Sequence, residues 1–290
     1  MKIIPLDQAP STLAASRARS GFSGYLACFN GIVWREMLRF VHQRERFLSA
    51  LVRPLVWLFI FAAGFRQVLG VSIIPPYETY VLYEVFVTPG LIGMILLFNA
   101  MQSSLSMVYD RETGAMRTLL VSPFPRWFLL TSKLIGGGTV ALLQVYVFLL
   151  IAHAWEIEPP LLGYLTVLPA LFLSSLMLGA LALFMSSVIK QLENFAGVMN
   201  FVIFPMFFAS SALYPLWRIR ESSPLLYEIC RFNPFTHAVE LIRFALYARL
   251  DPASLAAVLA FTAVFLAAAI YAYNPSKGLL GRRGAPGGTA

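Results

Sequence analysis

Six long segments of this chain carry almost no charge, and each has about the twenty residues that an apolar helix needs to cross a bilayer. The segments lie at 50–70, 86–108, 134–154, 162–187, 196–215 and 254–273. Hydrophobic residues make up 59% of the 290 residues and charged residues only 12%, against about 25% charged in an ordinary soluble domain. Continuous apolar runs exclude a soluble globule and argue against a transmembrane β-barrel. The sequence therefore predicts an all-α polytopic membrane protein with six transmembrane helices.

The positive charges indicate on which side of the membrane each loop lies. Sixteen of the 22 Lys and Arg residues fall in the N-terminal segment, between 109 and 133, at Lys190 or in the tail. The positive-inside rule then puts both termini in the cytoplasm. Because residues 1–20 lack the apolar core of a signal peptide, we expect a multi-pass protein of the bacterial inner membrane. The expected division is a cytoplasmic segment at 1–49, a transmembrane domain at 50–273 and a cytoplasmic tail at 274–290.

Two regions outside the predicted spans have an amphipathic pattern. Apolar residues recur at helical spacing over 25–46, which predicts an interfacial helix with its arginines on lipid headgroups; a solvated helix end is the alternative. The loop at 216–253 is long yet apolar, so we expect a pair of short helices on or re-entering the outer leaflet, with a soluble loop as the alternative. Asn233 is expected to cap a helix that begins at Pro234, with Glu240 and Arg243 off its apolar face.

Motifs for covalent chemistry, metal binding or nucleotide binding are missing from the sequence. No Lys-Ser or Lys-Thr follows Gly136–Gly138, so this run is not a phosphate loop and is more typical of close helix packing. The histidines and cysteines do not stand at metal-ligand spacing, and there is no G-x-S-x-G nucleophile motif. We therefore expect no cofactor, no metal and no nucleic acid partner.

The polar residues inside the predicted spans are few and mostly neutral. Asn99, Gln102, Gln144 and Asn200 can hydrogen-bond between helices, or they can line a transport pathway. Arg53, near the start of the first predicted span, is expected to extend to the lipid headgroups. The predicted spans thus lack the relay of ionisable groups that is typical of a proton- or sodium-driven carrier.

Three motifs, in order along the chain, connect it to a known family. Residues 110–123 read D-R-E-T-G-A-M-R-T-L-L-V-S-P and resemble the R-E-x-G-T-hydrophobic-E-x-L-x-x-S-P stretch of ABC-2 type transporter permeases. Ala115 and Arg117 depart from that pattern, which puts this part of the partner contact in doubt. The second match joins Q-L-E-N-F at 191–195 to F-P-M-F-F-A-S-S-A-L-Y-P at 204–215, and the third is N-P-F-T-H-A-V-E-L-I-R at 233–243.

The resemblance implies a transporter built from two such permeases and two separate ATPase subunits. It implies that the ATPase contacts Arg111, Glu112, Gly114, Arg117, Leu120, Ser122 and Pro123. It further implies a pathway between the permeases near the second and fifth spans, with Asn99, Gln102 and Asn200 as candidate lining residues. Asn233, Pro234, Glu240 and Arg243 would belong to an external helix. The expected function is export of a hydrophobic or amphiphilic compound by a homodimer in contact with membrane lipids.

A narrower resemblance and two other functional classes remain open. Residues 44–50, 74–77 and 191–214 are similar to permeases encoded with quinoprotein (PQQ-dependent) alcohol oxidation systems, while drug and lipo-oligosaccharide exporters share the general motifs. The other classes are an integral membrane enzyme that modifies lipids and a membrane scaffold without transport. Clustered histidines or carboxylates at one membrane face would favour the enzyme, and the absence of a neighbouring ATPase gene would favour the scaffold.

Overall fold

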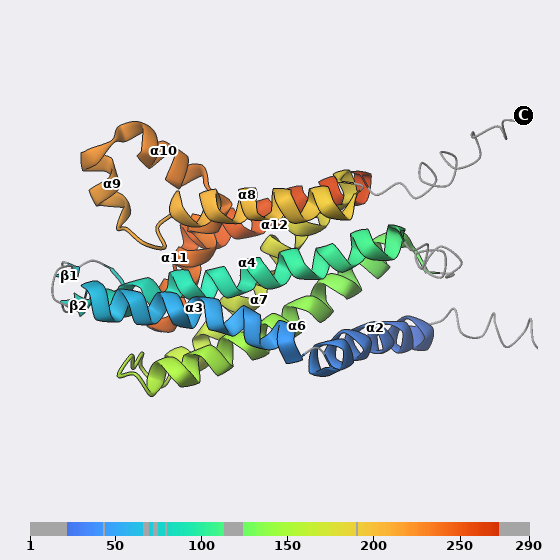
Figure 1. The fold of residues 1–290 in the computed structure, drawn as a ribbon, viewed down its shortest axis with the longest axis horizontal. Coiled ribbons are helices and arrows are strands. Elements are labelled where there is room, and N and C mark those ends of the chain that lie inside the picture. The colour runs from blue at the N-terminus through green and yellow to red at the C-terminus, as the bar shows by residue number, and fades with distance from the viewer. Residues whose placement is uncertain are drawn as a thin grey trace, which may run out of the picture.

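The computed structural model describes residues 22–42, 44–65, 70–71, 75–78, 80–112, 124–189 and 191–272. It is an elongated bundle in which most of the long helices run side by side (Figure 1). Phe22 and Ala272, the first and last described residues, belong to helices that reach the same end of the bundle, which we call the terminal end. Helices α9 and α10 lie at the opposite end, which we call the loop end.

The described part of the chain is almost entirely helical, as the apolar runs predict. The long helices are α2 (Phe22–His42), α3 (Arg44–Phe65), α4 (Tyr83–Glu112), α6 (Arg126–His153), α7 (Gly163–Val188), α8 (Leu192–Phe208) and α12 (Pro252–Ala272). A two-residue ladder departs from the all-α prediction: β1 (Gly70–Val71) pairs antiparallel with β2 (Val81–Leu82). This pairing closes the connection between α3 and α4 at the loop end.

Four of the predicted spans correspond to helices long and apolar enough to cross a membrane. These helices are Tyr83–Tyr109, Trp127–His153, Gly163–Val188 and Pro252–Ala272. The predicted spans at 50–70 and 196–215 correspond to shorter apolar helices, Leu51–Ile60 within α3 and Leu192–Phe208. Helix α8 ends at Phe208, and the residues up to 214 form turns and bends in place of the predicted helix. The complete six-span topology stays a prediction.

Helix α4 is the centre of the bundle. It packs against α3, α6, α7, α8 and α11. In its most apolar stretch 89% of the residues are buried, against 17% for α12, which packs mainly on α7 and α11. Helix α4 runs from the loop end towards the terminal end of the bundle (Figure 1).

The glycine run of α6 allows three other helices to approach closely, as the sequence predicts. A Cβ added to each of Gly136–Gly138 would lie within 3.4 Å of a different helix: α2 for the first, α4 for the second and α7 for the third. The nearest side chains in those helices are Glu36, Ser103 and Ser175. Larger residues would push the helices apart, because the interior is close-packed.

Helix α2 confirms the predicted amphipathic segment as a helix, and it packs along α6. The ring of Tyr25 meets the rings of Phe124 and Phe128 edge-on, at 4.9 Å each. Glu36 is buried against α6, with Arg35 at 3.5 Å and Arg39 at 3.9 Å from its carboxylate. Contact with lipid headgroups stays a prediction.

Lys133 corrects the sequence-based assignment of the loop between the second and third spans. The predicted span begins at residue 134, which leaves Lys133 in a cytoplasmic loop, but α6 begins eight residues earlier, at Arg126. The lysine therefore lies inside the helix, is only 6% exposed and donates a hydrogen bond to Ser106 of α4 at 3.3 Å. Arg126 and Lys133 in the first turns of α6 are charged, so an apolar run alone begins only at residue 134.

The loop before the last span contains three helices, one more than predicted. They are α9 (Leu216–Ser222), α10 (Pro224–Phe232) and α11 (Pro234–Leu246). Helices α10, α11 and α12 each begin with proline after a capping residue, Ser223, Asn233 or Asp251, whose side chain accepts backbone N–H groups. Helices α9 and α10 project from the bundle (Figure 1), whereas α11 packs against α4, α7 and α12.

Candidate functional site

The predicted coupling segment leaves the bundle at the terminal end. Arg111 and Glu112 belong to the last turn of α4. The remaining predicted residues, Gly114, Arg117, Leu120, Ser122 and Pro123, lie outside the described part of the chain. The structure therefore fixes where this segment starts and where the chain resumes, at Phe124, and its contact with an ATPase stays a prediction.

The predicted pathway residues do not come together in one place. Asn99 donates a hydrogen bond of 2.7 Å to Gln144, which joins α4 to α6 inside the bundle. Gln102 is half-buried on α4, whereas Asn200 is exposed on the outer face of α8. A cavity of about 20 Å³ beside Asn99 is lined by Ser103, Lys133 and other residues and has room for one water molecule. Asn99 thus joins two helices and Asn200 is exposed, and the role of these residues in a pathway stays a prediction.

Asn233 ties the end of α8 to the start of α11. Its Oδ1 accepts the backbone N–H of Phe235 at 2.9 Å, which confirms the predicted helix cap. Its Nδ2 donates to the backbone carbonyls of Met206 at 2.7 Å and Ala209 at 2.6 Å. Those carbonyls lack helical partners because α8 ends here. One side chain therefore caps two helices at once.

Arg243, near the other end of α11, binds the residues that follow α8. Its Nη2 donates to the carbonyl of Ser211 at 2.8 Å, and its Nη1 pairs with Glu240. The guanidinium also lies over the ring of Phe86 on α4, 4.3 Å from the centroid. Arg243 is only 2% exposed, so the third helix of this loop is a buried element and not a surface helix. The sequence prediction that it lies off the apolar face of this helix is wrong, because Arg243 is one helical turn from Val239 and is buried with it.

Helix α4 also contacts residues 206–213, the segment that Asn233 and Arg243 bind. The hydroxyl of Tyr83 donates to the carbonyl of Leu213 at 2.9 Å. A Cβ on Gly90 would lie 2.7 Å from the Cβ of Ala212, so only glycine fits this approach. We call the assembly of Tyr83, Gly90, Asn233 and Arg243 around residues 206–213 the clamp. It joins α4, α8 and α11 at the loop end.

Several polar atoms around the clamp are buried. Tyr77 packs edge-on against Tyr247 and lies beside Phe86. Burial raises the pKa of its hydroxyl, so that this group stays protonated beside Arg243. The Tyr77 hydroxyl and the Nε atom of Arg243 are both buried without a hydrogen-bond acceptor among the described atoms. Groups of this kind commonly bind ordered water.

Sequence reasoning missed two charged residues. The guanidinium of Arg53 lies over the ring of Phe98 in α4, 4.0 Å from the centroid, a contact that the sequence did not predict, and its predicted contact with lipid headgroups stays a prediction. Sequence reasoning also left Lys133 in a loop. The start of α6 at Arg126, eight residues before the predicted span, explains the difference at Lys133. The residues described in the structure contain no group of three His, Cys, Asp or Glu that could hold a metal ion.

Comparison with known proteins identifies the family. The model of the ABC-2 type transporter family matches residues 28–247. A protein named as a transport permease, ycf38, of Cyanophora paradoxa is 27% identical over 203 residues, which is 68% of this chain and 66% of the relative. Its namesake from Porphyra purpurea is 26% identical over 226 residues, 76% of this chain and 74% of the relative.

A bacterial relative supports the same assignment. YbhR of Escherichia coli K12, named as a multidrug ABC transporter permease, is 30% identical over 165 residues. That alignment covers 56% of this chain and 43% of the relative. The family match includes α4, the coupling segment and the whole clamp. The chain therefore belongs to the ABC-2 type transporter family of membrane permeases.

Proposed function

We propose that the chain is the membrane subunit of an ATP-driven exporter, in which two copies form the pathway and two separate ATPase subunits bind below them. The observation that carries this proposal is the course of α4. Its first turns contribute Tyr83 and Gly90 to the clamp and place Phe86 under Arg243, and its last turn leads into the coupling segment. Thirty residues of helix span about 45 Å, so α4 mechanically links the two ends.

The clamp is the element that this movement would act on. Because Asn233 binds carbonyls at the end of α8 and Arg243 binds the carbonyl of Ser211 just after it, α8 and α11 move together when α4 moves. ATP binding and hydrolysis would favour one of two arrangements through different contacts at the coupling segment. The clamp is then the outer gate of the pathway, and α8 is one of its walls.

The orientation in the membrane follows the charge distribution. We infer six spans in the bacterial inner membrane, with the terminal end in the cytoplasm and the loop end outside. The exposed Leu225, Ile229 and Phe232 of α10 would then enter the outer leaflet. Arg218 and Arg220, which lie over the rings of Trp217 and Tyr227, would stay at the headgroups.

The cargo is proposed to be hydrophobic or amphiphilic. One relative is named for multidrug transport, which supports this class. Helix α8 also exposes three phenylalanines, Phe201, Phe204 and Phe208.

Glu112→Lys tests the coupling proposal. The change reverses a charge in the last turn of α4 without altering the spans, so the protein should insert and fold normally. Loss of a charge-assisted hydrogen bond is worth about 1.5–3 kcal/mol, which is roughly a 10- to 100-fold weaker affinity for the ATPase. Affinity is measured with purified subunits, and transport activity is expected to fall with it.

Glu158→Lys is the matched control, because Glu158 is exposed in the connection between α6 and α7 at the loop end. It should leave ATPase affinity and transport unchanged. Unchanged affinity and full transport in the Glu112→Lys protein would show that residues 110–123 do not form the coupling element.

A further inference from the structure

An arginine side chain lies exposed near the middle of the bundle, where a membrane protein rarely has one. Arg53 is exposed on α3, and its guanidinium lies over Phe98 of α4. Phe98 is two residues, about 3 Å, from the midpoint of the membrane-crossing stretch Tyr83–Tyr109. A charge at this depth is costly against lipid chains, and such residues commonly line a pathway or bind a ligand. A polar or charged partner for Arg53 is therefore expected on this face.

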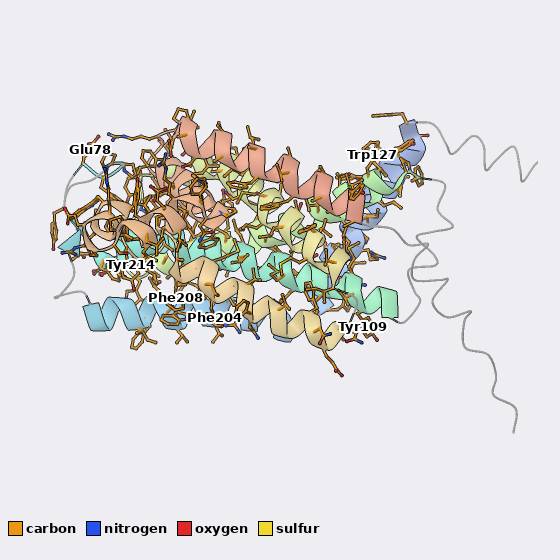
Figure 2. The ribbon with its side chains drawn as sticks, turned by 90° about the horizontal axis from the view of Figure 1, so that it is seen from above. Glu78, Tyr109, Trp127, Phe204, Phe208 and Tyr214 are labelled. Atoms are coloured by element: carbon orange, nitrogen blue, oxygen red, sulfur yellow. The ribbon has the colours of Figure 1, made fainter. Side chains whose placement is uncertain are left out.

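An aromatic row lies on α8 beside this face. Phe201, Phe204 and Phe208 follow one another at helical spacing and are 79%, 38% and 44% exposed. The rings of Phe204 and Phe208 stack with their centroids 6.3 Å apart, and Gly197 leaves open space one turn before Phe201. Figure 2 shows Phe204 and Phe208 together on the outer side of α8, with Tyr214 further along. The row offers ring faces to a flat apolar body.

The cation and the aromatic row belong to one surface. Helices α3 and α8 both pack against α4, and the ring of Trp57 on α3 meets Phe208 edge-on at 6.4 Å. Trp57 is one helical turn from Arg53 on α3. Asn200 is exposed on the same side of α8 as the row. An amide at this position is also poorly suited to lipid chains, because it would lack hydrogen-bond partners there.

The charges on this surface decide among its possible occupants. Apart from Glu193 in the first turn of α8, eight residues before Phe201, the sequence has no Asp or Glu in α8 or at 51–60 of α3. A second copy that placed the same patch against this one would bring arginine without a carboxylate to neutralise it. Lipid chains offer no charge at this depth either. A ligand that carries its own anionic group satisfies Arg53 and stacks its rings on the aromatic row.

We propose that the surface formed by Arg53 and the Phe201–Phe208 row binds an amphiphilic organic anion with an aromatic or similarly flat apolar body. This inference rests on the proposed function, and it identifies the chemical class of the exported compound. The acidic group lies at Arg53, the apolar body lies along α8, and Asn200 hydrogen-bonds polar substituents. Release then occurs towards the clamp, where α8 ends.

Two probes with the same ring system test this proposal. 8-Anilinonaphthalene-1-sulfonate carries one anionic group, and N-phenyl-1-naphthylamine is its neutral counterpart. Binding of each is measured with the complete permease–ATPase complex in phosphatidylcholine nanodiscs, after subtraction of empty discs. Arg53→Gln should weaken binding of the sulfonate about tenfold or more and leave the neutral probe within about twofold. Phe204→Ala with Phe208→Ala should weaken both probes.

Arg218→Gln is the matched control, because Arg218 is also an exposed arginine over an aromatic ring but lies on α9. It should bind both probes like the original protein. An unchanged sulfonate affinity in Arg53→Gln, or no saturable binding by the original protein, would overturn the proposal. Efficient disulfide cross-linking of Phe204→Cys between two copies, with Cys28 and Cys230 replaced by serine, would assign the surface to a dimer contact instead.

The same samples separate this inference from the proposed function. ATPase association and ATP hydrolysis are measured in each disc preparation. Arg53→Gln should keep both, because Arg53 lies over Phe98, which is 14 residues or about 21 Å of helix before Glu112. A chain that binds the sulfonate but no ATPase would contradict the proposed function. A complex that hydrolyses ATP but does not bind the sulfonate would contradict only the proposed binding surface.

Discussion

Replacing Arg243 with methionine is expected to lower the free energy of unfolding by about 3–5 kcal/mol, because it leaves the mostly buried carboxylate of Glu240 without its partner. The carbonyl of Ser211 also loses its hydrogen-bond donor. The midpoint of thermal unfolding of the detergent-solubilised protein should fall by several degrees, and transport should fall with it since the clamp no longer holds residues 206–213.

The double variant Arg243→Met with Glu240→Gln distinguishes the ion pair from simple packing. It removes both charges, so its unfolding midpoint should lie closer to that of the original protein than the single variant does. Arg231→Met is the matched control, because Arg231 pairs with Glu228 at 3.8 Å and both side chains are more than half exposed. That surface pair should contribute little. A single variant Arg243→Met as stable as this control would exclude a stabilising role for the buried pair.

Gly163→Ala should have a comparably large effect. Gly163 begins α7, and an added Cβ would lie 1.9 Å from the carbonyl oxygen of Leu246 at the end of α11. Backbone atoms cannot move out of the way as a flexible side chain can, so α7 and α11 must separate. Overpacking of this kind costs about 1–3 kcal/mol or more. The expected result is a lower unfolding midpoint and poor recovery of folded protein after solubilisation.

Gly197→Ala is the matched control on α8, where an added Cβ meets nothing within 4 Å. Alanine has a higher helix propensity than glycine by about 1 kcal/mol, so this variant should be as stable as the original protein or slightly more stable. If both alanine variants had the same unfolding midpoint, the close contact between α7 and α11 would not exist in the protein.

The helices themselves could be predicted from sequence, and the reason is their composition. Apolar runs with few charges specify a helix wherever they occur, so four predicted spans correspond to helices long enough to cross a membrane. Local signals were equally informative: the Asn233-Pro234 pair predicted the start of α11, and Gly136–Gly138 predicted close packing. The three motifs also predicted the family.

The burial of charged residues could not be predicted in the same way. Its polarity alone put Arg243 off the apolar face of α11, but the helix is covered by α4, α7 and α12, and Arg243 is buried one turn from Val239. Its partners, Ser211 and Phe86, lie 32 and 157 residues away along the chain. Lys133 was assigned to a loop because the predicted span begins eight residues after the start of α6, and that shift moves its side chain from a loop into the bundle.

The most direct test of the permease assignment is the mass of the purified complex. Co-expressed with its ATPase, the permease should elute as a complex of two permeases and two ATPase subunits, measured by light scattering with correction for detergent. That complex should hydrolyse ATP, and the permease alone should not. A permease that remains a monomer in the presence of the active ATPase, without a change in ATP hydrolysis, would contradict the account.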